Sequence, residues 1–257
     1  MIGTSVHLVG AGWRRVWARD GVAVCVAAAM TIVVEVGLWA LLRAKGVSPD
    51  RAVLTTLAAM SLWVPVAASA WAVGGATVGS CLLRGGEMAD ASAVALIVFW
   101  LTGAISFVAA AKLYCIFMAV AILASAIVSL SCRVERRVIL VGVATVVCLL
   151  LLASPVWLAG PAGVMPESPL RSLTVWSATL NPFFAVADAI SADIPFVWTD
   201  RPVMYRLTPL GGRLAVPAVS WAAPLIYLLP VGIVLSAAGA GARRVTRARP
   251  VAPPAAS

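Results

Sequence analysis

Glu35 is the residue of this chain whose surroundings most clearly point to chemistry. It lies near the middle of Gly21–Leu42, a run that contains no other charge. A carboxyl group inside a membrane-spanning helix is costly and is therefore usually functional or paired. It can relay a proton, contact a polar substrate, or, when protonated, make a hydrogen bond between helices. We favour the hydrogen bond between helices, because none of the other apolar runs contains a basic residue that could pair with Glu35.

The residues needed for the common enzymatic and metal-dependent reactions are missing from the sequence. It contains no Walker A lysine motif, no HExxH, no GxSxG and no glycine-rich dinucleotide loop after a strand. The five cysteines form no CxxC pair, and His7 is the single histidine, whereas zinc, di-iron and bis-histidine haem sites need clustered ligands. We therefore expect no metal, no cofactor and no enzymatic activity. Any ATP hydrolysis would have to occur in a partner.

The elements that position Glu35 are long uncharged runs. The chain is 62% hydrophobic and 11% charged, whereas a soluble domain carries roughly a quarter charged residues. A helix needs about 20 apolar residues to cross the hydrocarbon core of a bilayer. Five further uncharged runs reach that length: Ala52–Leu83, Ala91–Ala111, Leu113–Cys132, Val138–Pro166 and Leu214–Ala242. The sequence thus predicts an all-α, polytopic integral membrane protein.

We predict six transmembrane helices in one domain that covers residues 1–242. Their expected bounds are 21–43, 53–79, 91–111, 114–132, 138–159 and 217–240. Either Pro65 and Gly74-Gly75 kink the second helix, or its tail, Ser80-Cys81-Leu82-Leu83, lies at the membrane interface. Glu87 and Asp90 are expected to bound a loop between the second and third helices, and Lys112 a tight turn between the third and fourth.

Lys and Arg residues are distributed unevenly over the predicted loops. With the N-terminus inside, eleven of the 19 lie on the cytoplasmic side and eight outside, which favours a cytoplasmic N-terminus and C-terminus in the cell membrane. The net charge of +9 is split into short clusters next to apolar runs. Such clusters suit anionic lipid headgroups, whereas nucleic acid would require a continuous basic face.

Three segments are expected outside the membrane core. Trp13 and Trp17 share a helix face with arginines nearby, which predicts an N-terminal interfacial helix. The proline-rich segment 160–216 retains many aromatic residues and is expected to form an outer cap of short helices, one of them beginning at Asn181-Pro182. Residues 243–257 are expected to form a basic and then disordered cytoplasmic tail.

Small residues mark two faces for close helix packing. Gly75 and Gly79 have GxxxG spacing, a pattern that also arises by chance in a chain so rich in glycine and alanine. Gly232, Ser236 and Ala240 form a similar face in the last predicted helix.

The organisation of the chain resembles the permease subunit of type-2 ABC exporters, which has six spans per protomer. The leader Trp13–Asp20 is similar to the connector helix of that family. The stretch Ala124–Arg137, with a serine-rich helix end followed by a short basic turn, is the most similar part. Leu180-Asn181-Pro182-Phe183 and the basic C-terminus Arg243–Arg247 add to the resemblance. The segment Leu83–Asp90 departs from the family, because it retains only a reduced charge pattern.

The resemblance implies that two copies, or this chain and a homologous permease, form the pathway and that a separate cytoplasmic ATPase drives it. The substrate would be amphipathic or lipid-like. The implied ATPase-coupling residues lie in two segments. They are Arg84, Glu87 and Asp90 in the first segment, and Arg133, Glu135, Arg136 and Arg137 in the second.

Two alternatives remain open at the level of the sequence. The chain could be a secondary carrier that works without an ATPase and uses Glu35 for proton coupling, although no internal repeat is evident. It could also be a membrane-embedded enzyme or assembly factor with an outer site built from charged residues of segment 160–216. Those residues are Asp188, Asp193, Asp200, Arg201 and Arg206. A solvated outer cap is the simpler explanation of these charges.

Overall fold

The structure, a computed structural model, describes residues 3–154, 166–194 and 219–248. These residues form eight helices and no strand. The helices are α1 (Gly3–Ala44), α2 (Pro49–Ala72), α3 (Val78–Leu101), α4 (Phe107–Ser129), α5 (Val134–Leu152), α7 (Glu167–Leu180), α8 (Pro182–Ile190) and α10 (Ala223–Ala248). The predicted all-α class is confirmed for the described residues.

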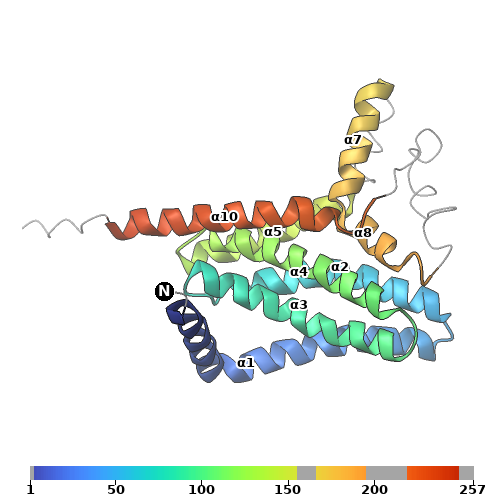
Figure 1. The fold of residues 1–257 in the computed structure, drawn as a ribbon, viewed down its shortest axis with the longest axis horizontal. Coiled ribbons are helices and arrows are strands. Elements are labelled where there is room, and N and C mark those ends of the chain that lie inside the picture. The colour runs from blue at the N-terminus through green and yellow to red at the C-terminus, as the bar shows by residue number, and fades with distance from the viewer. Residues whose placement is uncertain (1–2, 155–165, 195–218, 249–257) are drawn as a thin grey trace, which may run out of the picture.

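The six long helices run back and forth as an antiparallel bundle (Figure 1). Helix α4 occupies the centre and packs against α2, α3, α5 and α10, while α1 lies against α2 and α3. Leu57, Phe99 and Phe117 are fully buried between these helices. We call the end at which α2 and α4 end, and α3 and α5 begin, the arginine end. The first turns of α1 and the end of α10 lie at the same end in Figure 1.

Four of the long helices are long and apolar enough to cross a bilayer. They contain the spans Ala23–Ala44, Pro49–Ala72, Phe107–Ser129 and Ala223–Arg244. The bent pair α7 and α8, which meet at 68°, would make a fifth if it is counted as one broken span. Helices α3 and α5 do not qualify, because each carries three charged residues within its first thirteen positions. Several apolar helices therefore indicate a membrane-embedded protein.

The predicted bounds of the second and third helices are wrong, and local capping explains why. Helix α2 continues through Pro65 and ends at Ala72, so Gly74 and Gly75 lie in the turn that follows. Helix α3 begins at Val78 because Thr77 caps it: the Thr77 side chain accepts a hydrogen bond from Ser80 N. Charged residues that were assigned to a loop thus lie inside α3.

The turn between α3 and α4 also differs from the prediction. Gly103 has φ +70°, and the Ala104 and Gly103 amides donate to Phe99 O and Trp100 O, which is the Schellman pattern that ends a helix. Ser106 then caps α4 by accepting from Ala109 N. The turn therefore precedes Lys112, which lies one turn inside α4 rather than between two helices.

The remaining bounds shift by a few residues. Helix α4 corresponds to the helix predicted at 114–132. Helix α5 corresponds to the one predicted at 138–159, of which residues 155–159 lie outside the described residues. Helix α10 corresponds to the one predicted at 217–240 and extends to Ala248. Helix α1 is continuous from Gly3, so the predicted N-terminal interfacial helix is not a separate element. The dark-blue first turns of α1 nevertheless run at an angle to the rest of the helix (Figure 1).

Short helices do follow α5, as predicted for the outer cap. Helix α8 begins where expected: Asn181 Oδ1 accepts a hydrogen bond from Phe183 N at 2.9 Å, and Pro182 occupies the first helical position. Within segment 160–216, the structure describes only residues 166–194. In the predicted tail, residues 243–248 are helical and residues 249–257 lie outside the described range.

Candidate functional site

Glu35 meets Ser92 in the interior of the bundle. Glu35 of α1 is 2% exposed and Ser92 of α3 is fully buried. Ser92 Oγ lies 2.7 Å from Glu35 Oε1 and 3.1 Å from Met88 O. A hydroxyl group has one proton to donate. Ser92 is the donor in both contacts, so Glu35 Oε1 and Met88 O share its proton.

The surroundings of Glu35 are partly polar. Trp63 Nε1 donates to Thr31 Oγ1 at 3.4 Å, and Thr31 lies one turn before Glu35 on α1. Glu35 Oε2 and Trp39 Nε1 are buried without a hydrogen-bond partner among the described residues. Because residues four apart share a helix face, one acceptor and one donor remain free on the same side of α1. The arrangement serves helix contact and retains hydrogen-bonding capacity for a further polar group.

Glu87 is buried beside Trp71 rather than exposed in a loop. It is 8% exposed, and its Oε2 accepts a hydrogen bond from Trp71 Nε1 at 2.8 Å. The Arg84 guanidinium lies 5.4 Å from the Trp71 ring centroid, within cation–π range. The indole of Trp71 therefore contacts both charged side chains and links α2 to α3.

Asp90 is exposed on the outside of α3, where Tyr114 of α4 donates a hydrogen bond of 2.7 Å to its Oδ1. Asp90 and Glu87 are three positions apart on α3, and Ser92 follows two positions later. We call Glu35, Glu87 and Asp90 the acidic layer. Glu87 and Asp90 lie on α3, and Glu35 of α1 reaches the same helix at Ser92, so each carboxylate has a side-chain partner from another helix.

Arg137 is a buried structural residue at the arginine end. It is 4% exposed, and it donates to Ser131 O at 2.9 Å, to Val73 O at 2.9 Å and to Gly75 O. These carbonyl groups lie at the ends of α2 and α4, where a cation also interacts favourably with the helix dipoles.

Arg243 of α10 makes a second set of such contacts. It donates to Ala76 O at 2.9 Å, to Ser129 O at 3.1 Å and to Ser131 O at 3.3 Å. We call Arg137 and Arg243, together with the carbonyl groups they bind, the arginine junction. It joins the ends of α2 and α4 to α5 and α10.

The remaining residues of the basic turn point outward. Arg133, Glu135 and Arg136 are all exposed at the start of α5. The seven predicted coupling residues thus fall into two groups: these three are available to a partner, whereas Arg84, Glu87, Asp90 and Arg137 contact other helices. The junction was missed in the sequence. The structure shows that Arg137, Ala144 and Cys148 are the buried residues of α5 and recur at helical spacing, but their burial cannot be read from the sequence.

Two aspartates of segment 160–216 accept hydrogen bonds from backbone amides. Asp193 Oδ2 accepts from Ser106 N at 2.7 Å, at the start of α4. Asp188 Oδ2 accepts from Trp221 N at 2.9 Å, just before α10. Asp200, Arg201 and Arg206 lie outside the described residues. Among the residues described, no group of three or more His, Cys, Asp or Glu is arranged to hold a metal ion.

Small residues allow close packing around α4, but only the predicted face of α10 is used, with Gly232 and Ser236 buried and Gly239 buried where Ala240 was predicted. A Cβ at Gly232 would lie 3.2 Å from Ile122, and one at Gly239 would lie 2.9 Å from Ser129 O, so α10 packs on α4 through its small face. Gly75 packs against Cys81 within the turn, whereas Gly79 has only Thr77 near it. Helices α3 and α4 instead pack closely at Gly85, where an added Cβ would overlap Ser125.

Comparisons of the chain with models of known protein families, with curated proteins and with solved structures find no significant match.

Proposed function

We propose that this chain is the permease subunit of an ATP-driven exporter that moves an amphipathic or lipid-like substrate. Six long antiparallel helices support six membrane crossings. Four of them are apolar enough to cross on their own, and α3 and α5 are proposed as the other two. Charged residues inside α3 are compatible with a crossing because Trp71 and Tyr114 bind the carboxylates of Glu87 and Asp90. No nucleotide-binding motif is present in the sequence, so ATP hydrolysis is assigned to a partner subunit.

The observation that carries the proposal is the contrast between the exposed turn and the buried junction at the arginine end. Arg133, Glu135 and Arg136 form a charged surface, and the next residue, Arg137, binds carbonyl groups of α2 and α4. A force applied to the turn would therefore reach α2, α4 and, through Arg243, α10. This is the connection that a subunit driven by a cytoplasmic ATPase requires.

The proposal places the arginine end in the cytoplasm and both termini inside the cell. The first turns of α1 and the end of α10 lie at this same end of the bundle (Figure 1), as the predicted orientation requires. A second copy, or a homologous permease, is proposed to complete the pathway. The exposed Asp90–Tyr114 pair is a candidate for the surface facing that pathway, because an acidic group exposed to lipid is costly.

Affinity purification of the full chain from its source cells in a mild detergent tests this proposal. We expect a subunit with a Walker A motif to co-purify. Reversing the charges in the double variant Arg133→Glu and Arg136→Glu should lower its yield, whereas Lys45→Glu at the opposite end should not. Protein that transports substrate in vesicles without any ATPase would overturn the proposal.

A secondary carrier is the second candidate, and the free oxygen of Glu35 favours it. Glu35 Oε2 has no partner among the described residues, so the carboxyl group retains a site for proton exchange or substrate contact. Proton-dependent flux in liposomes that contain the chain alone, lost in Glu35→Gln, would establish this function. Flux that requires ATP and the partner would exclude it.

A further inference from the structure

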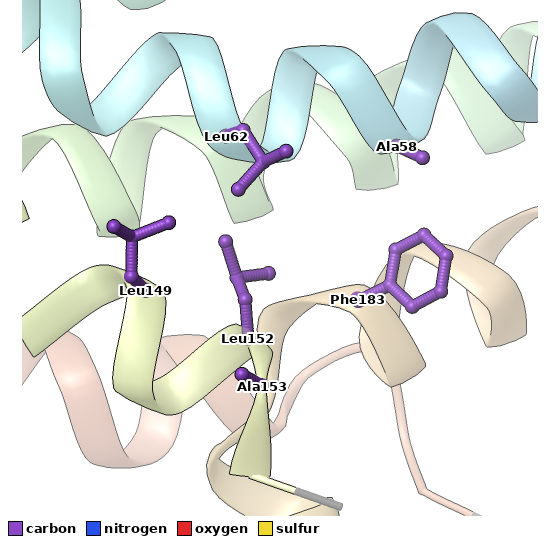
Figure 2. A pocket seen from close by; sticks show the side chains of 6 residues that line it. All are labelled: Ala58, Leu62, Leu149, Leu152, Ala153 and Phe183. Carbon is purple, nitrogen blue, oxygen red and sulfur yellow. The ribbon is translucent and has the colours of Figure 1, made fainter. Parts of the chain in front are cut away.

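An apolar pocket opens between α2, α5 and α8, close to the end of the bundle opposite the arginine end. Its volume is about 290 Å³. Its described lining residues are Ala58, Leu62, Leu149, Leu152, Ala153 and Phe183. Figure 2 shows Leu62 and Leu152 projecting into the space between α2 and α5, with the Phe183 ring at one side. None of these described lining residues has a polar side chain.

The size and composition of the pocket suit a hydrocarbon chain. An apolar cavity of roughly 150 Å³ stays free of water and accepts a molecule as large as benzene. This pocket is larger, about 290 Å³, and unlike an enclosed cavity it opens to the outside of the bundle, among helices that indicate a membrane-embedded protein. If the pocket lies at the depth of the hydrocarbon core, the molecules around it that can fill it are lipid acyl chains.

A basic residue lies on the same face of α2, nearer to the end of the bundle. Arg51, Thr55, Ala58 and Leu62 are spaced by four, three and four residues, which places them on one stripe of the helix. Arg51 and Thr55 are exposed, and the Thr55 hydroxyl donates to Arg51 O at 2.8 Å. No ion pair joins Arg51 to a carboxylate within the described part of the chain. Its charge is thus available to an anionic group.

The distance between the charge and the pocket matches the layers of a bilayer. At a rise of about 1.5 Å per residue, Ala58 and Leu62 lie about 10 and 16 Å along α2 from Arg51. The headgroup layer adds about 5–7 Å on each side of a hydrocarbon core roughly 30 Å thick. With Arg51 at the headgroup layer, the pocket therefore lies inside the hydrocarbon layer.

We propose that this stripe and pocket bind one anionic phospholipid of the bilayer, with an acyl chain in the pocket and its phosphate-bearing headgroup at Arg51. The charge of Arg51 complements an anionic headgroup, and the pocket complements the chain. Binding of this lipid is independent of whether the chain is a transporter. It would fill the crevice between α2, α5 and α8 and hold α8 against the bundle.

Photo-cross-linking tests the site on the purified full-length protein in phosphatidylcholine vesicles. The vesicles contain a trace of either phosphatidylglycerol or phosphatidylcholine carrying a diazirine in one acyl chain. Mass spectrometry then measures labelling of the peptides that contain α2 and α5. We expect phosphatidylglycerol to label them about fivefold more than phosphatidylcholine, because one basic residue near the surface contributes about 1 kcal/mol.

Two variants separate the parts of the site, each with a matched control. Arg51→Gln should remove the preference for phosphatidylglycerol, whereas Lys45→Gln should retain it. Leu62→Trp fills the pocket and should lower labelling by both lipids several-fold, whereas Leu101→Trp, at another exposed leucine, should not. Ala58→Phe serves the same purpose as Leu62→Trp if that variant does not fold.

Three results would overturn the proposal. These are equal labelling by the two lipids in the unmodified protein, labelling unaffected by a folded pocket variant, or a disulfide between two chains carrying Leu62→Cys. The disulfide would assign the pocket to a second copy of the chain. None of these results depends on transport activity or on an ATPase partner.

Discussion

Ser92 of α3 holds the Glu35 carboxyl group of α1 at an Oγ–Oε1 distance of 2.7 Å, across a separation of 57 residues in the chain. This contact ties α1 to the bundle at the position of its only charged residue between Gly21 and Leu42. Because both side chains are buried, the energetic value of the contact can be measured by removing either partner.

Ser92→Ala should lower the free energy of unfolding by about 0.5–2 kcal/mol, since hydrogen bonds between membrane helices fall in this range. Reversible unfolding in SDS, followed by circular dichroism, measures it. Ser61→Ala is the matched control, because Ser61 is also buried but donates only to Leu57 O within α2. Equal losses in the two variants would show that the Ser92–Glu35 contact has no special value.

Glu35→Gln should change the free energy of unfolding by less than about 0.5 kcal/mol, because the amide oxygen of glutamine can accept the hydrogen bond that Ser92 donates to Glu35 Oε1. Glu35→Ala should lower it by about 1–3 kcal/mol, since Ser92 loses a buried partner. The same SDS titration distinguishes them. If Glu35→Gln abolishes transport while the protein remains as stable as the original, Glu35 acts in the substrate or proton pathway.

Arg137→Gln should lower the free energy of unfolding by about 2–4 kcal/mol, because buried carbonyl groups of Val73, Gly75 and Ser131 lose a charged donor. Arg136→Gln, at the exposed neighbouring position, should change it by no more than about 0.5 kcal/mol. Thermal unfolding in detergent compares the stability losses of the two variants. Comparable effects would mean that the arginine junction does not hold the helix ends.

Gly85→Ala should destabilise the contact between α3 and α4 by about 1–3 kcal/mol, as overpacked core positions do. The new Cβ would overlap Ser125 Oγ and lie 2.7 Å from Ser125 Cβ and 3.2 Å from Ala121 O. Adding Ser125→Gly should restore part of the stability. Gly142→Ala is the control, because nothing lies within 4 Å of that position, and alanine is the better helix former.

Asn181→Ala should lower stability by about 1–2 kcal/mol, because it removes the cap of α8 and the donor to Leu152 O at 3.1 Å. Asn181→Asp retains the cap acceptor and loses the donor, so its loss should be smaller. Protease sensitivity of the segment around α8, compared between the two variants, provides a local readout. If both variants behave alike, the cap contributes nothing.

The start of α8 was predictable from the sequence because it is decided locally. Asn181 and Pro182 carry the capping side chain and the fixed φ angle in adjacent residues. The limits of α3 also had local signals, Thr77 and Ser80 at the start and Gly103 at the end. They were overridden by the assumption that charged residues lie outside the membrane.

The partners of those charged residues were not predictable. Trp71 reaches Glu87 from α2, and Tyr114 reaches Asp90 from α4, so each pair depends on how two helices pack. The arginine junction has the same origin. The residues around Arg136 and Arg137 do not reveal that Arg137 binds carbonyl groups at the end of α2 and that Arg136 does not. This depends on which face of α5 packs against the bundle.

Arg243 also has a consequence for the order in which the protein is made. Its carbonyl partners Ala76 and Ser129 precede it by 167 and 114 residues, so the ribosome completes α2 and α4 long before their donor exists. A chain that stops before Arg243 leaves the carbonyl groups of Ala76 and Ser129 without that donor. The ends of α2 and α4 therefore gain their full set of donors only after α10 has been made.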